Sequence, residues 1–142
     1  MNVDELRSLA RSALWSDRAR AGEELSSYVG RADVDAVLQE LLLDRRDTGV
    51  IAQTAEALLA RGGTAAWRVF LVVWGLATPV QADHLGGATG QVLFEASMDA
   101  AKAQAMRECL TLLSTDEDES VRQSAEEWLR RVNRALAYGM EG

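Results

Sequence analysis

An acidic run is the densest group of chemically active side chains in this sequence. Asp116, Glu117, Asp118 and Glu119 follow one another directly before an amphipathic helical pattern. Carboxylates at a helix start accept hydrogen bonds from free backbone N–H groups and interact favourably with the helix dipole. Acid–base catalysis instead needs carboxylates that converge in a pocket. We interpret the run as a helix start. Because four acids exceed the need of one cap, contact with a basic partner is the functional alternative.

Metal and thiol chemistry have few candidate residues. The chain has one histidine, His84, and one cysteine, Cys109. These counts exclude an internal disulfide, a cysteine-rich zinc site and the usual multi-histidine metal centres. The glycine-rich segment 86–90 lacks the Gly-Lys-Ser/Thr ending with which phosphate loops bind phosphate and magnesium. We therefore expect no metal and no cofactor.

Two tryptophans could form either a core or a pocket. Trp67 and Trp74 are seven residues apart, with Phe70 between them, so all three lie on one stripe of a helix. Such a stripe is typical of core packing, because aromatic side chains bury large areas. A pocket in which these rings stack on a nucleobase is the functional alternative. We expect Trp15 and Trp128 to lie at the two ends of the fold.

Length and charge limit the classes of function. The 142 residues, of which 48% are hydrophobic, suit one domain over 1–142. With 15 basic and 22 acidic residues, the formal charge of −7 argues against a general nucleic-acid binder. The N-terminus carries no apolar signal core, and the longest nearly apolar run, 65–77, is shorter than the ~20 residues of a membrane span. We expect a cytoplasmic protein with no membrane partner.

The hydrophobic periodicity is helical along almost the whole chain, and no segment alternates convincingly with period two. An all-α fold is therefore predicted. Asp33 and Ser114-Thr115-Asp116 are the expected N-terminal caps of the third and the last helix. The clear helical patterns cover 3–14, about 21–29 ending at Gly30, 34–42, 50–61, 64–76, 98–113 and a last segment from 121 to near Gly139.

The pattern weakens over residues 77–97. Thr78-Pro79 predicts a helix start, with a short helix to about Leu85. Segment 84–90 has the composition of a loop. Segment 91–96 fits a strand or a helix, and its context favours a helix.

A small residue followed by a leucine four positions later recurs along the chain. The last helix carries Arg122, Ala125 and Leu129, and the second carries Arg18, Ala21 and Leu25 at identical spacing. Thr54 and Leu58 repeat the pair in the fourth helix. Leu25 and Leu58 are 33 residues apart, and Leu58 and Leu129 are 71 apart, which leaves room for one degenerate unit near Leu93.

With this signature, and the loop acids that precede it at Asp47 and Asp118, the chain resembles the HEAT-like (armadillo-type) helical repeat family. The resemblance covers about three quarters of the chain and fails between Ala77 and Ser97. It implies a HEAT-like α-α superhelix of about four antiparallel helix pairs, with a degenerate third repeat. It also implies a concave face of the kind that commonly holds a protein partner.

We therefore predict a non-catalytic protein-binding module, a monomer or weak dimer whose partner is basic. An immunity or inhibitor protein for a basic toxin and an intracellular adaptor are both compatible. The alternative is a HEAT-like DNA glycosylase acting on alkylated bases, which would need a basic groove for the duplex. The predicted binding residues are Arg20, Glu23, Glu24, Gln53, Glu56, Asp116, Glu117, Asp118, Glu119, Gln123, Glu126 and Glu127.

Overall fold

The computed structural model describes the backbone of residues 1–141 and the side chains of residues 1–137. Within that part of the chain every regular element is a helix and no strand occurs, which confirms the all-α class. The elements are α1 (Val3–Leu9), α2 (Trp15–Leu25), the 3₁₀ turn η1 (Ser26–Tyr28), α3 (Ala32–Leu42), α4 (Thr48–Arg61), α5 (Thr64–Leu76), α6 (Pro79–Ala88), α7 (Gly90–Ser97), α8 (Ala100–Leu113) and α9 (Glu119–Glu141).

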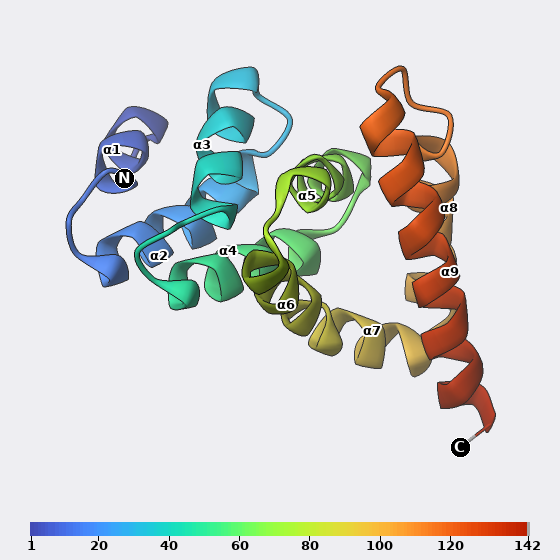
Figure 1. Ribbon diagram of the computed structural model, residues 1–142. Coiled ribbons are helices and arrows are strands. Elements are labelled where there is room, and N and C mark those ends of the chain that lie inside the picture. The colour runs from blue at the N-terminus through green and yellow to red at the C-terminus, as the bar shows by residue number, and fades with distance from the viewer. Residues whose placement is uncertain (142) are drawn as a thin grey trace.

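The first six helices form two rows (Figure 1). In one row α3 packs between α1 and α5, and in the other α4 packs between α2 and α6. Helix α7 continues from α6 and contacts α8 and α9, which pack against each other at the far end. Helices α1 to α5 therefore each contact a neighbour in their own row and a helix of the other row, whereas α6 packs mainly on α4.

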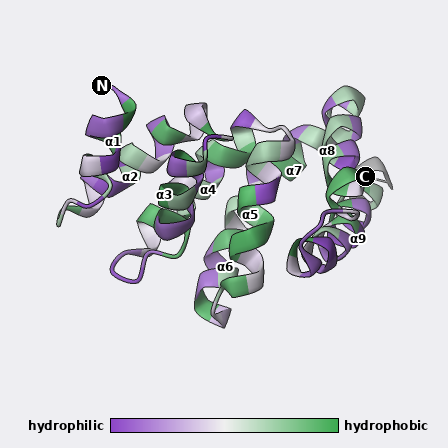
Figure 2. Ribbon diagram, turned by 90° about the horizontal axis from the view of Figure 1, so that it is seen from above, coloured by the Kyte–Doolittle hydropathy of each residue, from purple (hydrophilic) through white to green (hydrophobic). Residues whose placement is uncertain are grey.

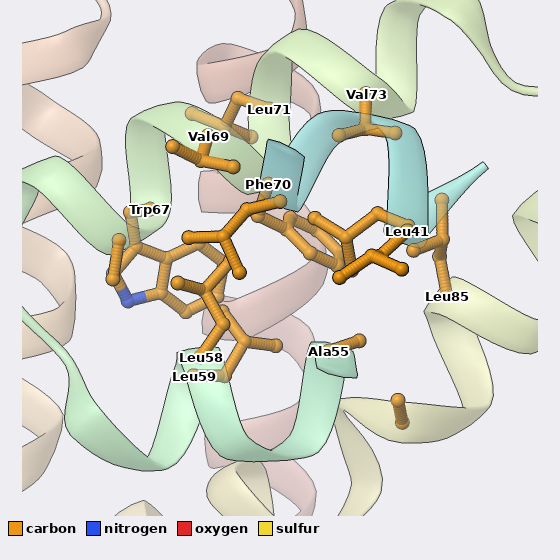
Figure 3. Close-up of a cluster of buried hydrophobic side chains, with 14 of the residues drawn as sticks. Leu41, Ala55, Leu58, Leu59, Trp67, Val69, Phe70, Leu71, Val73 and Leu85 are labelled. Carbon is orange, nitrogen blue, oxygen red and sulfur yellow. The ribbon is translucent and has the colours of Figure 1, made fainter. Parts of the chain in front are cut away.

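Helix α5 occupies the interior, as its apolar composition predicts. It contacts α3, α4, α8 and α9, and its ribbon is hydrophobic along most of its length in Figure 2. Figure 3 shows Trp67, Phe70 and Leu71 from this helix among side chains of α3, α4 and α6. Phe70 and Leu71 are fully buried.

The small residues of the repeated signature lie against neighbouring helices. Ala21, Thr54 and Ala125 are completely buried. Leu25 and Leu58 are also completely buried, and Leu129 packs partly buried against the same core. The prediction that these positions face other helices is confirmed.

Segment 84–90 is helical except for a turn at Thr89, and the prediction of a loop there is wrong. Thr78 and Gln81 form a capping box, with Pro79 in the first turn, so α6 has a well-defined start. Leu85 and Ala88 are buried and continue the helix through Gly86 and Gly87. Helix α7 follows at once from Gly90, which confirms the helical choice for segment 91–96.

Several helix limits also differ from the sequence prediction. Helix α1 ends at Leu9, so Leu14 lies outside it and occupies the N-cap position of α2, without a side-chain capping hydrogen bond. Helix α2 ends at Leu25, where the Ser26 hydroxyl donates to the Gly22 carbonyl and a 3₁₀ turn follows. Helix α8 begins at Ala100, after the N-cap Asp99. Helix α9 reaches Glu141, beyond the expected end near Gly139.

Two of the expected caps are replaced by other residues. Arg31 occupies the N-cap position of α3, and Asp33 lies in the first turn, where it pairs with Arg31. At the start of α9, the Asp118 carboxylate accepts hydrogen bonds from the N–H groups of Ser120 and Val121. Asp116 pairs with Arg68 instead.

Within residues 1–141, no helix combines the length and the apolar composition needed to cross a bilayer.

Candidate functional site

Two adjoining hollows form a groove across α2, α4, α7 and α8. They share Ala60, Val92 and Glu95, so they are continuous. The acidic end has a volume of about 330 Å³ and is lined by Glu23, Gln53, Glu56, Ala57, Ala60, Ala88, Gln91, Val92 and Glu95. The apolar end has a volume of about 290 Å³ and is lined by Leu59, Ala60, Arg61, Gly62, Gly63, Trp67, Val92, Glu95, Lys102, Ala105, Met106 and Cys109.

Helix packing positions the acidic end. Gly22 on α2 lies directly against the side chain of Thr54 on α4, so the two helices approach closely. Their sequence neighbours Glu23 and Gln53 consequently line the same hollow. Glu56 lies one turn after Gln53 on the same side of α4, as expected for positions three apart.

The acidic end carries uncompensated negative charge. Glu23 and Glu56 form no ion pair with any residue whose side chain is described. Glu95 lies 3.6 Å from the ammonium of Lys102, and the Gln91 amide donates to the same Glu95 carboxylate at 3.2 Å. Of these three carboxylates, two are therefore free to attract a cation, and the end of the groove near α2 is the more negative.

Trp67 dominates the apolar end. Its side chain is only 2% exposed, yet it lines the hollow together with Met106 and Cys109. In Figure 3 the indole nitrogen lies on the side of the ring that faces away from Leu58, Leu59 and Phe70. The Trp67 Nε1 atom is not among the buried polar atoms without a partner, so it reaches solvent at the wall of the hollow.

Of the twelve predicted binding residues, Glu23, Gln53 and Glu56 line the groove. Arg20 and Glu24 form an ion pair of 3.7 Å on α2, outside the groove lining. The remaining predicted residues lie at the start of α9 and along it, and none of them lines the groove. The structure thus divides the predicted set into a first group on α2 and α4 and a second group at the start of α9 and along it.

The second group makes mainly intramolecular contacts. Asp116 accepts two hydrogen bonds from Arg68, at 3.0 and 3.1 Å, and this interaction holds the pKa of Asp116 below its ordinary value. Gln123 donates to Glu119 at 3.3 Å. Glu127 accepts from Trp74 Nε1 and from Arg131. Glu117 and Glu126 are exposed.

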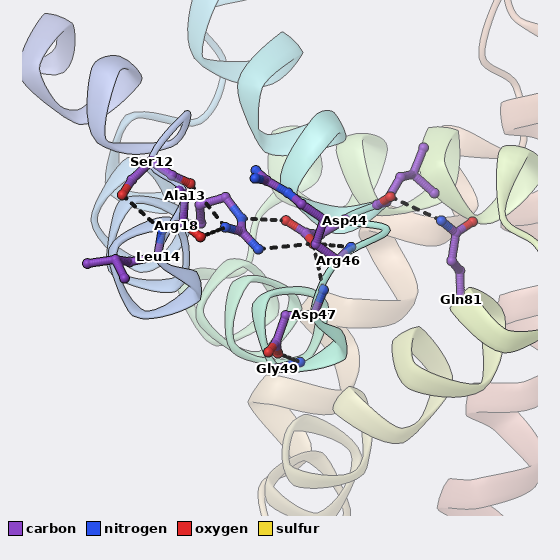
Figure 4. Close-up of polar contacts among 10 residues, drawn as sticks. Ser12, Ala13, Leu14, Arg18, Asp44, Arg46, Asp47, Gly49 and Gln81 are labelled. Atoms are coloured by element: carbon purple, nitrogen blue, oxygen red, sulfur yellow. Dashed lines mark hydrogen bonds and ion pairs between the residues drawn. The ribbon is translucent and has the colours of Figure 1, made fainter.

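A buried ion pair joins α2 to the connection between α3 and α4 (Figure 4). Arg18 donates to Asp44 at 2.8 Å, with side chains only 2% and 6% exposed. Burial raises the pKa of Asp44. The hydrogen bonds from Arg18 and from the N–H groups of Asp47 and Arg46 outweigh that effect and hold the pKa below its ordinary value. Because Asp47 caps α4 through the N–H of Gly49, the pair also fixes the start of a groove helix.

The tryptophan stripe packs internally, as the core interpretation predicts. Trp128 lies with its ring centroid 5.0 Å from that of Trp74 and 5.3 Å from that of Phe70. Trp128 is 2% exposed and lies on α9, the last helix. Trp15 is 48% exposed at the start of α2.

Among the described residues, no cluster of three or more histidine, cysteine, aspartate or glutamate side chains has the spacing of a metal site. In comparisons with known proteins, no family model, no curated protein and no solved structure matched this chain.

Sequence reasoning missed the part of the groove that α7 and α8 contribute. Gln91 and Glu95 come from the segment whose pattern was weakest, and Lys102 and Met106 follow it. Gln91 and Glu95 are four apart, the spacing that places two side chains on one helix face. That spacing was the available signal.

Proposed function

We propose that this chain is a HEAT-like helical repeat protein that binds another protein through the groove and carries out no catalysis itself. The observation that carries the proposal is the convergence of Glu23, Gln53 and Glu56, from two helices, on one groove with uncompensated negative charge. A basic protein surface complements such a groove electrostatically.

A repeated contact supports the repeat assignment. Arg18 Nη1 donates to the carbonyls of Ser12 and Ala13, six and five residues earlier. Arg122 Nη1 donates to the carbonyls of Asp116 and Glu117, again six and five residues earlier. Arg18 and Arg122 therefore make equivalent hydrogen bonds to the turns before α2 and before α9. This equivalence is expected if both helices are second helices of related pairs.

In the repeat assignment, α1 and α2, α3 and α4, and α8 and α9 are three helix pairs. The degenerate third pair consists of α5 with the interrupted helix α6–α7. The break after Ala88 lets α7 turn towards α8 and α9, which it contacts. The groove lies where α7 meets α4 and α8, so the degeneracy has a structural consequence at the proposed site.

The basic partner fits two cellular roles, an inhibitor that covers a basic toxin such as a nuclease, or an adaptor for a basic intracellular protein. Both roles use the same face, so one experiment tests them together. A photo-crosslinking amino acid is placed at Gln53 inside the groove and, as a matched control, at the exposed Glu40 on α3. Cells producing each variant are irradiated, and the adducts are identified by mass spectrometry.

We expect discrete protein adducts from position 53 and none of these from position 40. Equal adducts from both positions, or none from position 53, would contradict binding through the groove. Nucleic-acid adducts at position 53 would instead favour the glycosylase alternative. In that case, duplex affinity should fall steeply with salt concentration in a titration.

A further inference from the structure

The groove places two different chemistries side by side. Glu23 and Glu56 occupy its acidic end, and Trp67 and Met106 occupy its apolar end. Ala60, Val92 and Glu95 line both ends, so the two ends are continuous. A ligand that lies along the groove contacts both ends at once.

The acidic end selects the sign of the ligand's charge. The two free carboxylates repel phosphates and acidic peptides, and they attract lysine or arginine. Arginine suits such a site because its guanidinium can bind carboxylates through two parallel hydrogen bonds.

The apolar end offers a hydrogen-bond donor as well as an apolar wall. Trp67 is buried in the core except where it lines the groove, and its indole N–H has no acceptor among the described residues. The N–H faces solvent at the groove wall, so an acceptor on a bound segment can take the place of water on it. A peptide backbone carbonyl supplies such an acceptor, and the adjoining side chain supplies the apolar contact with Met106.

We infer that the occupant of the groove is a basic amphipathic segment of the partner protein, with a lysine or arginine at Glu23 and Glu56 and an apolar side chain at Trp67. This inference rests on the proposed function and adds the chemistry of the bound segment. The juxtaposition that carries it is the free carboxylate pair at one end of a continuous groove and the Trp67 indole with Met106 at the other.

The test uses the full chain, labelled with ¹⁵N, and a synthetic peptide of leucine and lysine that forms an amphipathic helix of about four turns. A matched peptide carries glutamate in place of lysine, and a second control carries serine in place of leucine. The Trp67 indole N–H signal reports the apolar end. The Trp15 indole, which lies outside the groove lining, is the internal control.

We expect the leucine–lysine peptide to shift the Trp67 signal and leave the Trp15 signal unchanged. Glu23→Gln with Glu56→Gln should weaken its binding about tenfold, whereas Glu40→Gln should leave it unchanged. The glutamate peptide should not bind, and the serine peptide should bind weakly without shifting Trp67.

An unmoved Trp67 signal, equal binding of the glutamate peptide, or equal effects of the groove and Glu40 variants would each overturn the inference. Its failure can be distinguished from failure of the proposed function. If position 53 crosslinks a protein while the leucine–lysine peptide leaves Trp67 unmoved, binding through the groove stands and the basic amphipathic segment is wrong. If position 53 crosslinks no protein, the proposed function fails.

Discussion

Gly22 of α2 lies so close to Thr54 of α4 that a Cβ atom on Gly22 would overlap the threonine hydroxyl. Thr54 is completely buried, and its Oγ1 atom has no hydrogen-bond partner among the described residues. The contact therefore depends on shape and not on hydrogen bonding. It brings α2 and α4 together next to Glu23 and Gln53, so it sets the width of the acidic end of the groove.

Gly22→Ala should destabilise the fold by about 1–3 kcal/mol, because the added methyl group must displace Thr54 or separate the helices. Urea unfolding followed by circular dichroism measures the change. Gly86→Ala is the matched control, since nothing lies within 4 Å of a Cβ at that helical position. It should stabilise by about 0.5–1 kcal/mol. A Gly22→Ala variant as stable as the parent would contradict the close approach.

Asp44→Asn should destabilise the fold by about 3–5 kcal/mol, because it leaves the buried guanidinium of Arg18 without a counter-charge. Thermal unfolding at neutral pH measures this loss. The exposed pair of Arg31 and Asp33 offers a control, and Asp33→Asn should change the melting temperature little. Similar losses of stability in both variants would contradict the claim that the buried Arg18–Asp44 pair contributes more than an exposed pair.

Acid should weaken the fold through the same carboxylates. The pKa values of Asp44 and Asp116 are lower in the folded state than their ordinary value of 3.8. A lowered folded pKa adds stability that is present above the ordinary value and is lost as pH falls through the folded pKa. Stability should therefore decline progressively below about pH 4.

The double variant Asp44→Asn, Asp116→Asn should start less stable and lose less of its stability over that pH range. Urea unfolding at a series of pH values measures both slopes. An unchanged acid slope in the double variant would mean that other groups cause the decline.

Trp128→Ala should cost about 3–5 kcal/mol, because it removes a large buried ring that packs against Trp74 and Phe70. Trp15→Ala, at a residue that is 48% exposed, is the control and should cost much less. Denaturant unfolding of both variants gives the comparison. Equal costs would contradict the burial of Trp128 against Trp74 and Phe70.

The sequence predicts the helices well, because amphipathic periodicity records which face of each helix is buried. Ala21, Thr54 and Ala125 were identified from spacing alone, and all three are completely buried. The limits of α1 and α2 were harder to predict. They depend on hydrogen bonds such as those from Arg18 to the carbonyls of Ser12 and Ala13, which no local pattern shows.

The groove is only half predictable for a related reason. Glu23, Gln53 and Glu56 were recognised as exposed positions on clear helices. Gln91 and Glu95 were missed, because the glycines before them suggested a loop. Gly86 and Gly87 are tolerated in α6 because the capping box starts the helix and buried Leu85 holds it against the core.

The affinity of the protein captured from position 53 for charge-reversed chains tests the central claim most directly. Isothermal titration calorimetry compares the parent with Glu23→Lys, Glu56→Lys and with the control Glu40→Lys. We predict that the groove variant raises Kd about a hundredfold, while the control leaves Kd unchanged and both variants unfold like the parent. An unchanged Kd in the groove variant, or an equal rise in the control, would contradict binding through the groove.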